Sequence, residues 1–214
     1  MPVSILLADD HAVVRDGLRL LLEAQPDLRV TGAAATGREA VRLAQRLRPD
    51  VVIMDLVMPE LNGREATQQI VAALPGTRVI ILSMYSTSDH IAGALQAGAQ
   101  GYLLKGSAGA EVVEAVRVVA SGARYLSPAI ADKVLDDSLR PGRPLSPLES
   151  LSPREREILQ LIVEGKTSLE AARLLSLSPK TVETYRSRLM EKLGVHDLPG
   201  LVKFAIQNGL TSLE

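Results

Sequence analysis

The sequence has no cysteine and no tryptophan, one phenylalanine and four tyrosines. Without cysteine, disulfide scaffolds, Cys-ligated zinc and thiol catalysis are excluded. The three histidines, His11, His90 and His196, lack the helical spacing of a histidine metal motif. Because aromatic residues make up only 2% of the chain, its cores must be aliphatic and each tyrosine needs a specific explanation.

Long apolar runs and a large net charge are lacking too. No run approaches the roughly 18 residues of a membrane span, and the first ten residues have no basic segment of a signal peptide. We therefore expect a cytoplasmic protein with no membrane partner. The net charge is −1, which argues against bulk binding of polyanions but permits a local basic face. The 214 residues, 46% of them apolar, suffice for two globular domains.

In the first part of the chain, five short apolar runs alternate with amphipathic stretches. The runs are unbroken and β-branched, as in strands that are buried on both faces. The stretches between them repeat apolar residues at helical spacing. This alternation predicts an α/β, flavodoxin-like fold with a doubly wound, parallel five-stranded sheet in the order 2-1-3-4-5. The expected strands lie at 5–8, 28–34, 51–54, 79–82 and 101–104.

The composition changes near 138–147, where three prolines and a glycine occur without periodicity. We predict a first domain over 1–122 and a linker over 123–147, with 128–137 as the candidate for a short helix. A separate all-α domain of four helices follows over 148–214.

Helix start signals define the four helices. Ser152 and Thr167 each begin a capping box, Ser178 precedes a proline, and Asp197 caps the last helix. The second and third helices are joined by a short turn and form a helix-turn-helix.

A group of polar residues follows or ends the predicted strands: Asp9 and Asp10 after the first, Asp55, Ser83 and Lys105 at later ones. The carboxyl ends of parallel strands form the edge where such sheets bind ligands. Three adjacent carboxylates need a cation among them, and an oxygen-only ligand set suits Mg²⁺. With a lysine and a hydroxyl, this site suits phosphoryl transfer onto a carboxylate. Asp55 is then the nucleophile, and Asp9 and Asp10 hold the metal.

Each of these residues also has an ordinary structural explanation. Taken alone, Asp9 is explained as a helix cap and Ser83 as a cap or loop residue. Lys105 taken alone is explained as a solvated side chain. Only their conjunction at one sheet edge favours a site.

The segment Asp55-Leu-Val-Met-Pro59 with Gly63, taken together with Asp9-Asp10, Ser83 and Leu103-Leu104-Lys105, resembles the receiver domain of two-component response regulators. The resemblance covers roughly 3–122. It implies Asp55 as the phosphoacceptor, with Lys105 beside it. It also implies that Asp10, Asp55 and the Val57 carbonyl bind Mg²⁺, with Asp9 as an outer-shell acid.

The same resemblance implies that Ser83 and Tyr102 form a switch pair, in which the hydroxyl moves to the phosphoryl group and the ring turns inward. One departure is Gly106, where many receivers have proline after the lysine. Val57 and Tyr85 lie two positions beyond Asp55 and Ser83, and neither would orient an attacking water. We therefore expect a slowly hydrolysed phosphoaspartate.

The third helix of the second domain has a polar face opposite Val182, Leu189 and Leu193. From Pro179 to Lys192 it carries four basic and two acidic residues. It is either the recognition helix of a DNA-binding motif or the solvated face of a small bundle. The candidate DNA contacts are Lys180, Thr181, Glu183, Thr184, Ser187, Arg188 and Lys192.

The segments 151–159, 178–184 and 191–194 resemble the LuxR-type helix-turn-helix, and the whole chain resembles a NarL/FixJ-type response regulator. Leu169 and Ala171 depart from the usual sequence of the first motif helix, and Tyr185 stands where relatives often have histidine. In such families the last helix pairs two subunits on two-fold related DNA half-sites. Its candidate dimerisation residues are Leu198, Leu201, Val202 and Ala205.

The expected function is therefore a transcription regulator, not an enzyme, that a sensor histidine kinase phosphorylates on Asp55 and that binds double-stranded DNA as a homodimer. One alternative is a phosphohydrolase, but this would need a second aspartate at the position of Val57. The other is an adaptor that binds a protein through its helical domain.

Overall fold

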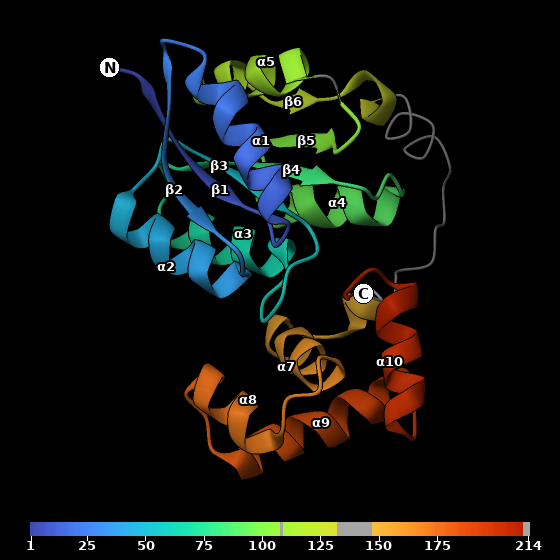
Figure 1. Ribbon diagram of the computed structural model, residues 1–214. Helices are drawn as coiled ribbons and strands as arrows, with labels where there is room; N and C mark the ends of the chain where they lie inside the picture. The colour runs from blue at the N-terminus through green and yellow to red at the C-terminus, as the bar shows by residue number, and fades with distance from the viewer. Residues whose placement is uncertain (108, 132–146, 212–214) are drawn as a thin grey trace.

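The computed structural model describes residues 1–107, 109–131 and 147–211. Figure 1 shows two units, a sheet with helices on both faces and a smaller group of helices. The first helix of the smaller unit, α7 (Pro153–Val163), faces the loop between β3 and α3 of the larger one. Among the described residues, no helix is both long and apolar enough to span a membrane.

The sheet is parallel, with the strand order β2-β1-β3-β4-β5-β6. The flavodoxin-like class and the predicted order of the first five strands are thus confirmed. A two-residue strand, β6 (Tyr125–Leu126), extends the sheet beyond these five. The other strands are β1 (Val3–Ala8), β2 (Leu28–Ala34), β3 (Val51–Asp55), β4 (Arg78–Ser83) and β5 (Gly101–Leu104).

Two aliphatic cores cover the two faces of the sheet. Along β1, Ile5 and Leu7 pack toward one face, whereas Leu6 and Ala8 pack toward the other, as the two-residue period of a strand requires. The first core is closed by α1 (Ala12–Glu23) and α5 (Gly109–Ala120). The second is closed by α2 (Gly37–Leu47), α3 (Gly63–Ala73) and α4 (Ser88–Gln96).

The helical unit begins with a 3-10 turn (Pro147–Ser150) and α7. The helices α8 (Ser168–Leu175), α9 (Pro179–Leu193) and α10 (Leu198–Gln207) follow. Both predicted capping boxes are present, at Ser152 and at Thr167. Of the short helix expected over 128–137, residues 128–131 are helical and 132–137 lie outside the described residues.

Gly63 lets α3 begin directly beside the end of β3. A Cβ atom at this position would lie 2.0 Å from the Asp55 carbonyl oxygen. We expect Gly63→Ala to lower the free energy of unfolding by about 3 kcal/mol or more, because a backbone atom would have to move. Urea unfolding measures this loss.

The matched control is Gly17→Ala, because a Cβ at Gly17 of α1 meets nothing within 4 Å. That change is expected to be neutral or stabilising by up to about 1 kcal/mol. Equal stability of the Gly63→Ala variant and the wild type would contradict the packing described here.

Candidate functional site

The structure brings the predicted acidic residues and Lys105 together at the carboxyl edge of the sheet. Asp9 follows β1, Asp55 ends β3, and Lys105 follows β5. The Lys105 Nζ lies 2.7 Å from Asp55 Oδ2 and 2.8 Å from Asp9 Oδ2. The backbone N–H of Lys105 also donates to the Ser83 carbonyl at 2.9 Å. One ammonium therefore bridges two carboxylates that come from different strands.

Burial sets the electrostatics of this group. Asp55 is 5% exposed, and its burial, together with the nearby Asp9 and Asp10 carboxylates, raises the pKa of Asp55 to about 6 although Lys105 acts in the opposite direction. Burial alone would lower the pKa of Lys105, but its ion pairs with Asp55 and Asp9 raise it. The ammonium thus stays charged while the acidic cluster retains uncompensated negative charge.

The acidic cluster fits a hard divalent cation. Ligand atoms of Asp9, Asp10, His11 and Asp55 lie within 4.8 Å of one another. The Asp10 Oδ1 atom is buried and accepts no hydrogen bond, although the His11 Nδ1 lies 2.7 Å from it. Asp10 and Val57 also line the same cleft. Carboxylate and carbonyl oxygens are the ligands that suit Mg²⁺.

The alternative role of Asp9 as a helix cap does not apply to α1. The residue at the N-cap of α1 is His11, and Asp9 Oδ1 accepts the backbone N–H of His11 at 2.9 Å. The other Asp9 oxygen faces Lys105.

For Asp55 as the phosphoacceptor that the sequence resemblance implies, the raised pKa predicts a pH dependence of phosphoryl transfer. A nucleophilic carboxylate must be ionised, and Asp55 gains a proton as the pH falls through about 6. At low Mg²⁺ concentration, we expect the rate of labelling by acetyl phosphate to fall below pH 6, approaching about ten-fold per pH unit. Initial rates between pH 5 and 8 test this, and a rate that stays flat down to pH 5 would contradict it.

The proposed switch residues lie directly behind the acidic cluster. Ser83 is fully buried, and its Oγ accepts the backbone N–H of Tyr85 at 3.1 Å. Tyr102 is also fully buried, and its hydroxyl donates to the Tyr85 carbonyl at 2.8 Å. Burial raises the pKa of Tyr102 to about 12, so the hydroxyl remains a donor. The ring of Tyr102 therefore occupies the inward position in this structure.

Most of the candidate DNA-contacting residues are exposed on α9. This helix packs into its domain through Val182 and Leu189, which are both fully buried. Figure 1 places α9 on the side of the helical unit that is remote from the sheet. Tyr185 is half-buried against the core of the helical domain. The exposed candidates are Lys180, Glu183, Thr184, Ser187, Arg188 and Lys192, whereas Thr181 is half-buried.

Lys192 already has a partner within the helical domain. Its Nζ lies 2.8 Å from Glu155 Oε2, the same carboxylate that completes the capping box of α7. A phosphate contact by Lys192 would compete with this ion pair. Lys180 and Arg188 are therefore the better candidates for basic contacts from α9.

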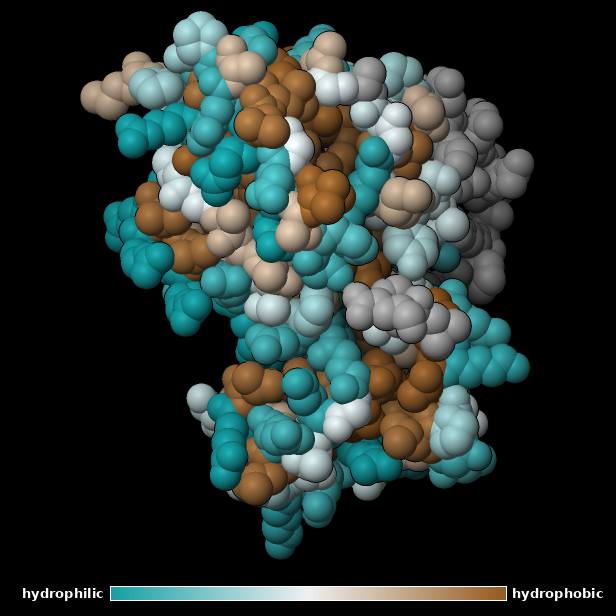
Figure 2. All heavy atoms as spheres, in the orientation of Figure 1, coloured by the Kyte–Doolittle hydropathy of each residue, from teal (hydrophilic) through white to brown (hydrophobic). Residues whose placement is uncertain are grey.

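Two of the four dimerisation residues predicted on α10 are not on its exposed face. Leu201 and Ala205 are fully buried in the core of the helical domain, so they are core residues rather than part of an exposed dimerisation surface. Leu198 is 43% exposed and Val202 is half-buried. Hydrophobic side chains gather over α10 in Figure 2. A shallow cleft on this face is lined by Leu198, Pro199, Val202, Lys203, Ile206 and Gln207.

The capping signals that predict α7 do not reveal the polar face by which this helix contacts the sheet domain. Arg156, Gln160 and Glu164 recur at intervals of four residues, which places them on one side of the helix. Arg156 pairs with Glu65 of α3, Gln160 bonds to the backbone after β3, and Glu164 accepts the backbone N–H of Glu60. The four-residue spacing of these polar side chains is the sequence signal that indicates such a face.

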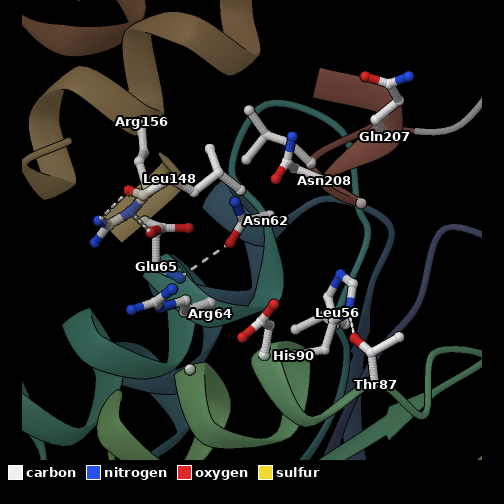
Figure 3. Close-up of a pocket in the computed structure, with 14 residues that line it drawn as sticks. Leu56, Asn62, Arg64, Glu65, Thr87, His90, Leu148, Arg156, Gln207 and Asn208 are labelled. Carbon is white, nitrogen blue, oxygen red and sulfur yellow. Dashed lines mark hydrogen bonds and ion pairs between the residues drawn. The ribbon is translucent and has the colours of Figure 1, made fainter. Parts of the chain in front are cut away.

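A cavity lies between the two domains next to this contact. Figure 3 shows Arg156 of α7 extending toward Glu65, while Asn62 accepts a hydrogen bond from the backbone at the start of α3. His90 of α4 lies on the opposite side of the cavity, and burial lowers its pKa. The two domains therefore meet through side chains from α3, α4, α7 and the end of α10.

Two family models match the chain. Residues 5–117 match the response regulator receiver domain, and residues 149–205 match the bacterial regulatory proteins of the luxR family. The chain therefore belongs to the NarL/FixJ-type response regulators, which join a receiver domain to a LuxR-type domain.

Individual relatives resemble it over almost the whole length. It is 43% identical to the transcriptional regulatory protein LiaR of Bacillus subtilis, over 98% of this chain and 100% of LiaR. It is 40% identical to the response regulator UvrY of Escherichia coli K12, over 99% and 97% of the two chains. The structure of an RcsB–DNA complex matches with a TM-score of 0.60 and 25% identity, over 95% of this chain and 98% of that one.

Proposed function

We propose that this response regulator accepts a phosphoryl group on Asp55 from a sensor histidine kinase and then regulates transcription from the cytoplasm as a DNA-bound dimer. The receiver is assigned to 1–122 and the DNA-binding domain to 148–214. The observation that carries the proposal is the Asp55 carboxylate, held 2.7 Å from Lys105 beside Asp9 and Asp10. The arrangement supplies a nucleophile and a fixed positive charge at one sheet edge.

In the transfer, an Asp55 carboxylate oxygen attacks phosphorus, a new O–P bond forms, and the P–N bond of a phosphohistidine breaks. Mg²⁺ held by Asp10, Asp55 and the Val57 carbonyl would offset the negative charge of the phosphoryl oxygens. Lys105 keeps the nucleophile oriented and supplies a donor for a phosphoryl oxygen. Asp9 holds Lys105 from the other side at 2.8 Å, which is consistent with an outer-shell role.

Ser83 and the loop that follows β4 would transmit the change caused by phosphorylation of Asp55. The Ser83 hydroxyl is available to donate to the phosphoryl group, and its shift would release the backbone N–H of Tyr85 that it now binds. Tyr102 already holds the Tyr85 carbonyl from its inward position, so the movement left for phosphorylation to cause is that of Ser83 and the loop after β4. At the output end, α9 is proposed to enter the major groove, and the exposed face of α10 to pair two subunits.

The experiment that tests this function is labelling of the purified chain with radioactive acetyl phosphate and Mg²⁺, followed by selection of genomic DNA fragments. We expect incorporation of at most one phosphoryl group per chain and retention of specific fragments. Continuous turnover of a chromogenic phosphate ester would instead indicate a phosphohydrolase. Failure to retain any fragment, with or without phosphorylation, would favour a protein-binding adaptor.

The phosphoaspartate is expected to last many minutes rather than seconds. Val57 offers no polar group to an attacking water, and the Tyr85 ring stacks on His90 with their centroids 4.7 Å apart. After removal of acetyl phosphate, the loss of label in the presence of Mg²⁺ gives the half-life. A half-life of a few seconds would contradict this expectation.

A further inference from the structure

We propose that Gln160, which lies on α7 of the DNA-binding domain, is a positioning residue for the phosphoryl-transfer site of the receiver. This inference rests on the proposed function of Asp55. It assigns to a side chain of the output domain the task of holding the loop that supplies the Val57 carbonyl.

The loop between β3 and α3 contains residues 56–62, directly after Asp55. Gln160 is 1% exposed and contacts this loop at two points. Its Nε2 donates to the Met58 carbonyl at 2.7 Å, and its Oε1 accepts the backbone N–H of Asn62 at 2.8 Å. A single side-chain amide thus closes the five-residue stretch that begins immediately after Val57.

Glu164, the C-cap residue directly after α7, extends this contact. Both of its carboxylate oxygens lie 3.1 Å from the backbone nitrogen of Glu60. Glu60 has φ 68°, a left-handed conformation that is unfavourable for a residue other than glycine. Gln160 Nε2 also donates to Glu164 Oε1 at 2.7 Å, so the amide orients the carboxylate that holds this strained residue.

The loop satisfies only part of its own backbone. Among the described residues, Leu61 donates to Pro59 and Gly63 donates to Leu56 within this region. The Met58 carbonyl and the N–H groups of Glu60 and Asn62 have their hydrogen bonds to α7 instead. Buried backbone groups require partners, and a loop that loses them takes up other conformations. The position of the Val57 carbonyl therefore depends on α7.

The same interface offers a matched control. Gln69 Nε2 of α3 donates to Glu157 Oε1 of α7 at 2.9 Å. This contact also joins a glutamine amide to the other domain, but it lies on α3 beyond the loop. Gln69→Ala thus removes an interdomain hydrogen bond without removing a partner of the loop backbone.

The test is Mg²⁺ binding by the full-length chain, measured by isothermal titration calorimetry. We expect Gln160→Ala to raise the Kd for Mg²⁺ about ten-fold, as substitutions behind a metal ligand commonly do. Gln69→Ala should change this Kd by less than about two-fold. With acetyl phosphate, the labelling rate of Gln160→Ala should be low at limiting Mg²⁺ and approach the wild-type rate at saturating Mg²⁺.

A second variant, Gln160→Glu, keeps the side-chain volume and one acceptor but removes the donor to Met58 and adds charge beside Glu164. If Gln160 positions the loop, this variant also raises the Kd for Mg²⁺ about ten-fold. If Gln160 only fills space, the Gln160→Glu variant binds Mg²⁺ with the same Kd as the wild type, and this result would overturn the inference.

Equal changes in the Gln160→Ala and Gln69→Ala variants would also overturn it, because domain docking in general would then be the cause. The failure of the proposed function looks different. In that case the wild type takes up no phosphoryl group from acetyl phosphate, while the difference in Mg²⁺ affinity between the two variants persists and supports the positioning role.

Discussion

Replacing Asp55 with asparagine is expected to reduce Mg²⁺-dependent labelling by acetyl phosphate to background. The amide cannot form the acyl phosphate, and neither Asp9 nor Asp10 substitutes for it, since Lys105 holds Asp9 and Asp10 faces His11. Labelled protein, resolved by gel and quantified per chain, gives the result. The control is Asp16→Asn, an exposed carboxylate on α1, which should label as the wild type does.

The Asp55→Asn variant should not lose stability. Its loss of labelling can therefore be distinguished from a loss of folding. A pKa raised from 3.8 to about 6 means that ionised Asp55 is disfavoured in the native state. Between pH 3.8 and about 6, Asp55 is protonated in the native state but ionised in the unfolded state. The contribution of Asp55 to the free energy of unfolding therefore declines as the pH rises from about 4 to 6, and it is constant above that range. The penalty at pH 7 is about 3 kcal/mol at most.

Without Mg²⁺, the Asp55→Asn variant is therefore expected to unfold at a higher temperature than the wild type at pH 7. The variant is free of the cost of ionising a buried Asp55 carboxylate, and Lys105 keeps its ion pair with Asp9. It therefore recovers part of the about 3 kcal/mol at most that this cost amounts to. Thermal unfolding measures the difference. Label that persists at full stoichiometry in a folded variant would refute the assignment of Asp55.

The double variant Lys180→Ala, Arg188→Ala is expected to bind a selected operator fragment about 100-fold more weakly, at about ten-fold per residue. Both side chains are exposed on α9. Each lost phosphate contact also lowers the slope of log affinity against log salt concentration by about 1. Binding isotherms at several salt concentrations therefore test the magnitude and its electrostatic origin together.

The double variant Arg42→Ala, Arg46→Ala is the charge-matched control for this experiment, since both arginines are exposed on α2 of the receiver. It should leave both affinity and salt slope unchanged. Lys192→Ala is expected to have a smaller effect on the slope than Arg188→Ala, because Lys192 already pairs with Glu155. If the double variant Lys180→Ala, Arg188→Ala keeps the wild-type slope, α9 is not the helix that contacts DNA.

Local sequence patterns predicted the sheet and the acidic cluster well for a physical reason. Strands buried on both faces need unbroken apolar runs, and the parallel order then brings their carboxyl ends to one edge. Once 5–8 and 51–54 are neighbouring strands, Asp9 and Asp55 must lie near each other. The short β6 was missed because a two-residue strand has no periodicity to detect.

The contacts between domains could not be predicted in the same way. Arg156 and Gln160 are buried where α7 contacts the receiver, and their partners there lie far away in the sequence. Glu65 is 91 positions from Arg156, and Met58 is 102 positions from Gln160. Likewise, the apolar pattern of α10 does not tell which of its residues face the domain core. Leu201 packs inward and Leu198 outward on the same helix.

The most direct test of the account is the affinity of a selected DNA fragment for the wild type and for Asp55→Asn, each with and without acetyl phosphate and Mg²⁺. We predict that acetyl phosphate tightens binding by the wild type within the range of about 5- to 150-fold that is typical of coupled sites. The Asp55→Asn variant should show no gain. An equal gain in both proteins, or none in a fully labelled wild type, would contradict the claim that phosphorylation of Asp55 controls DNA binding.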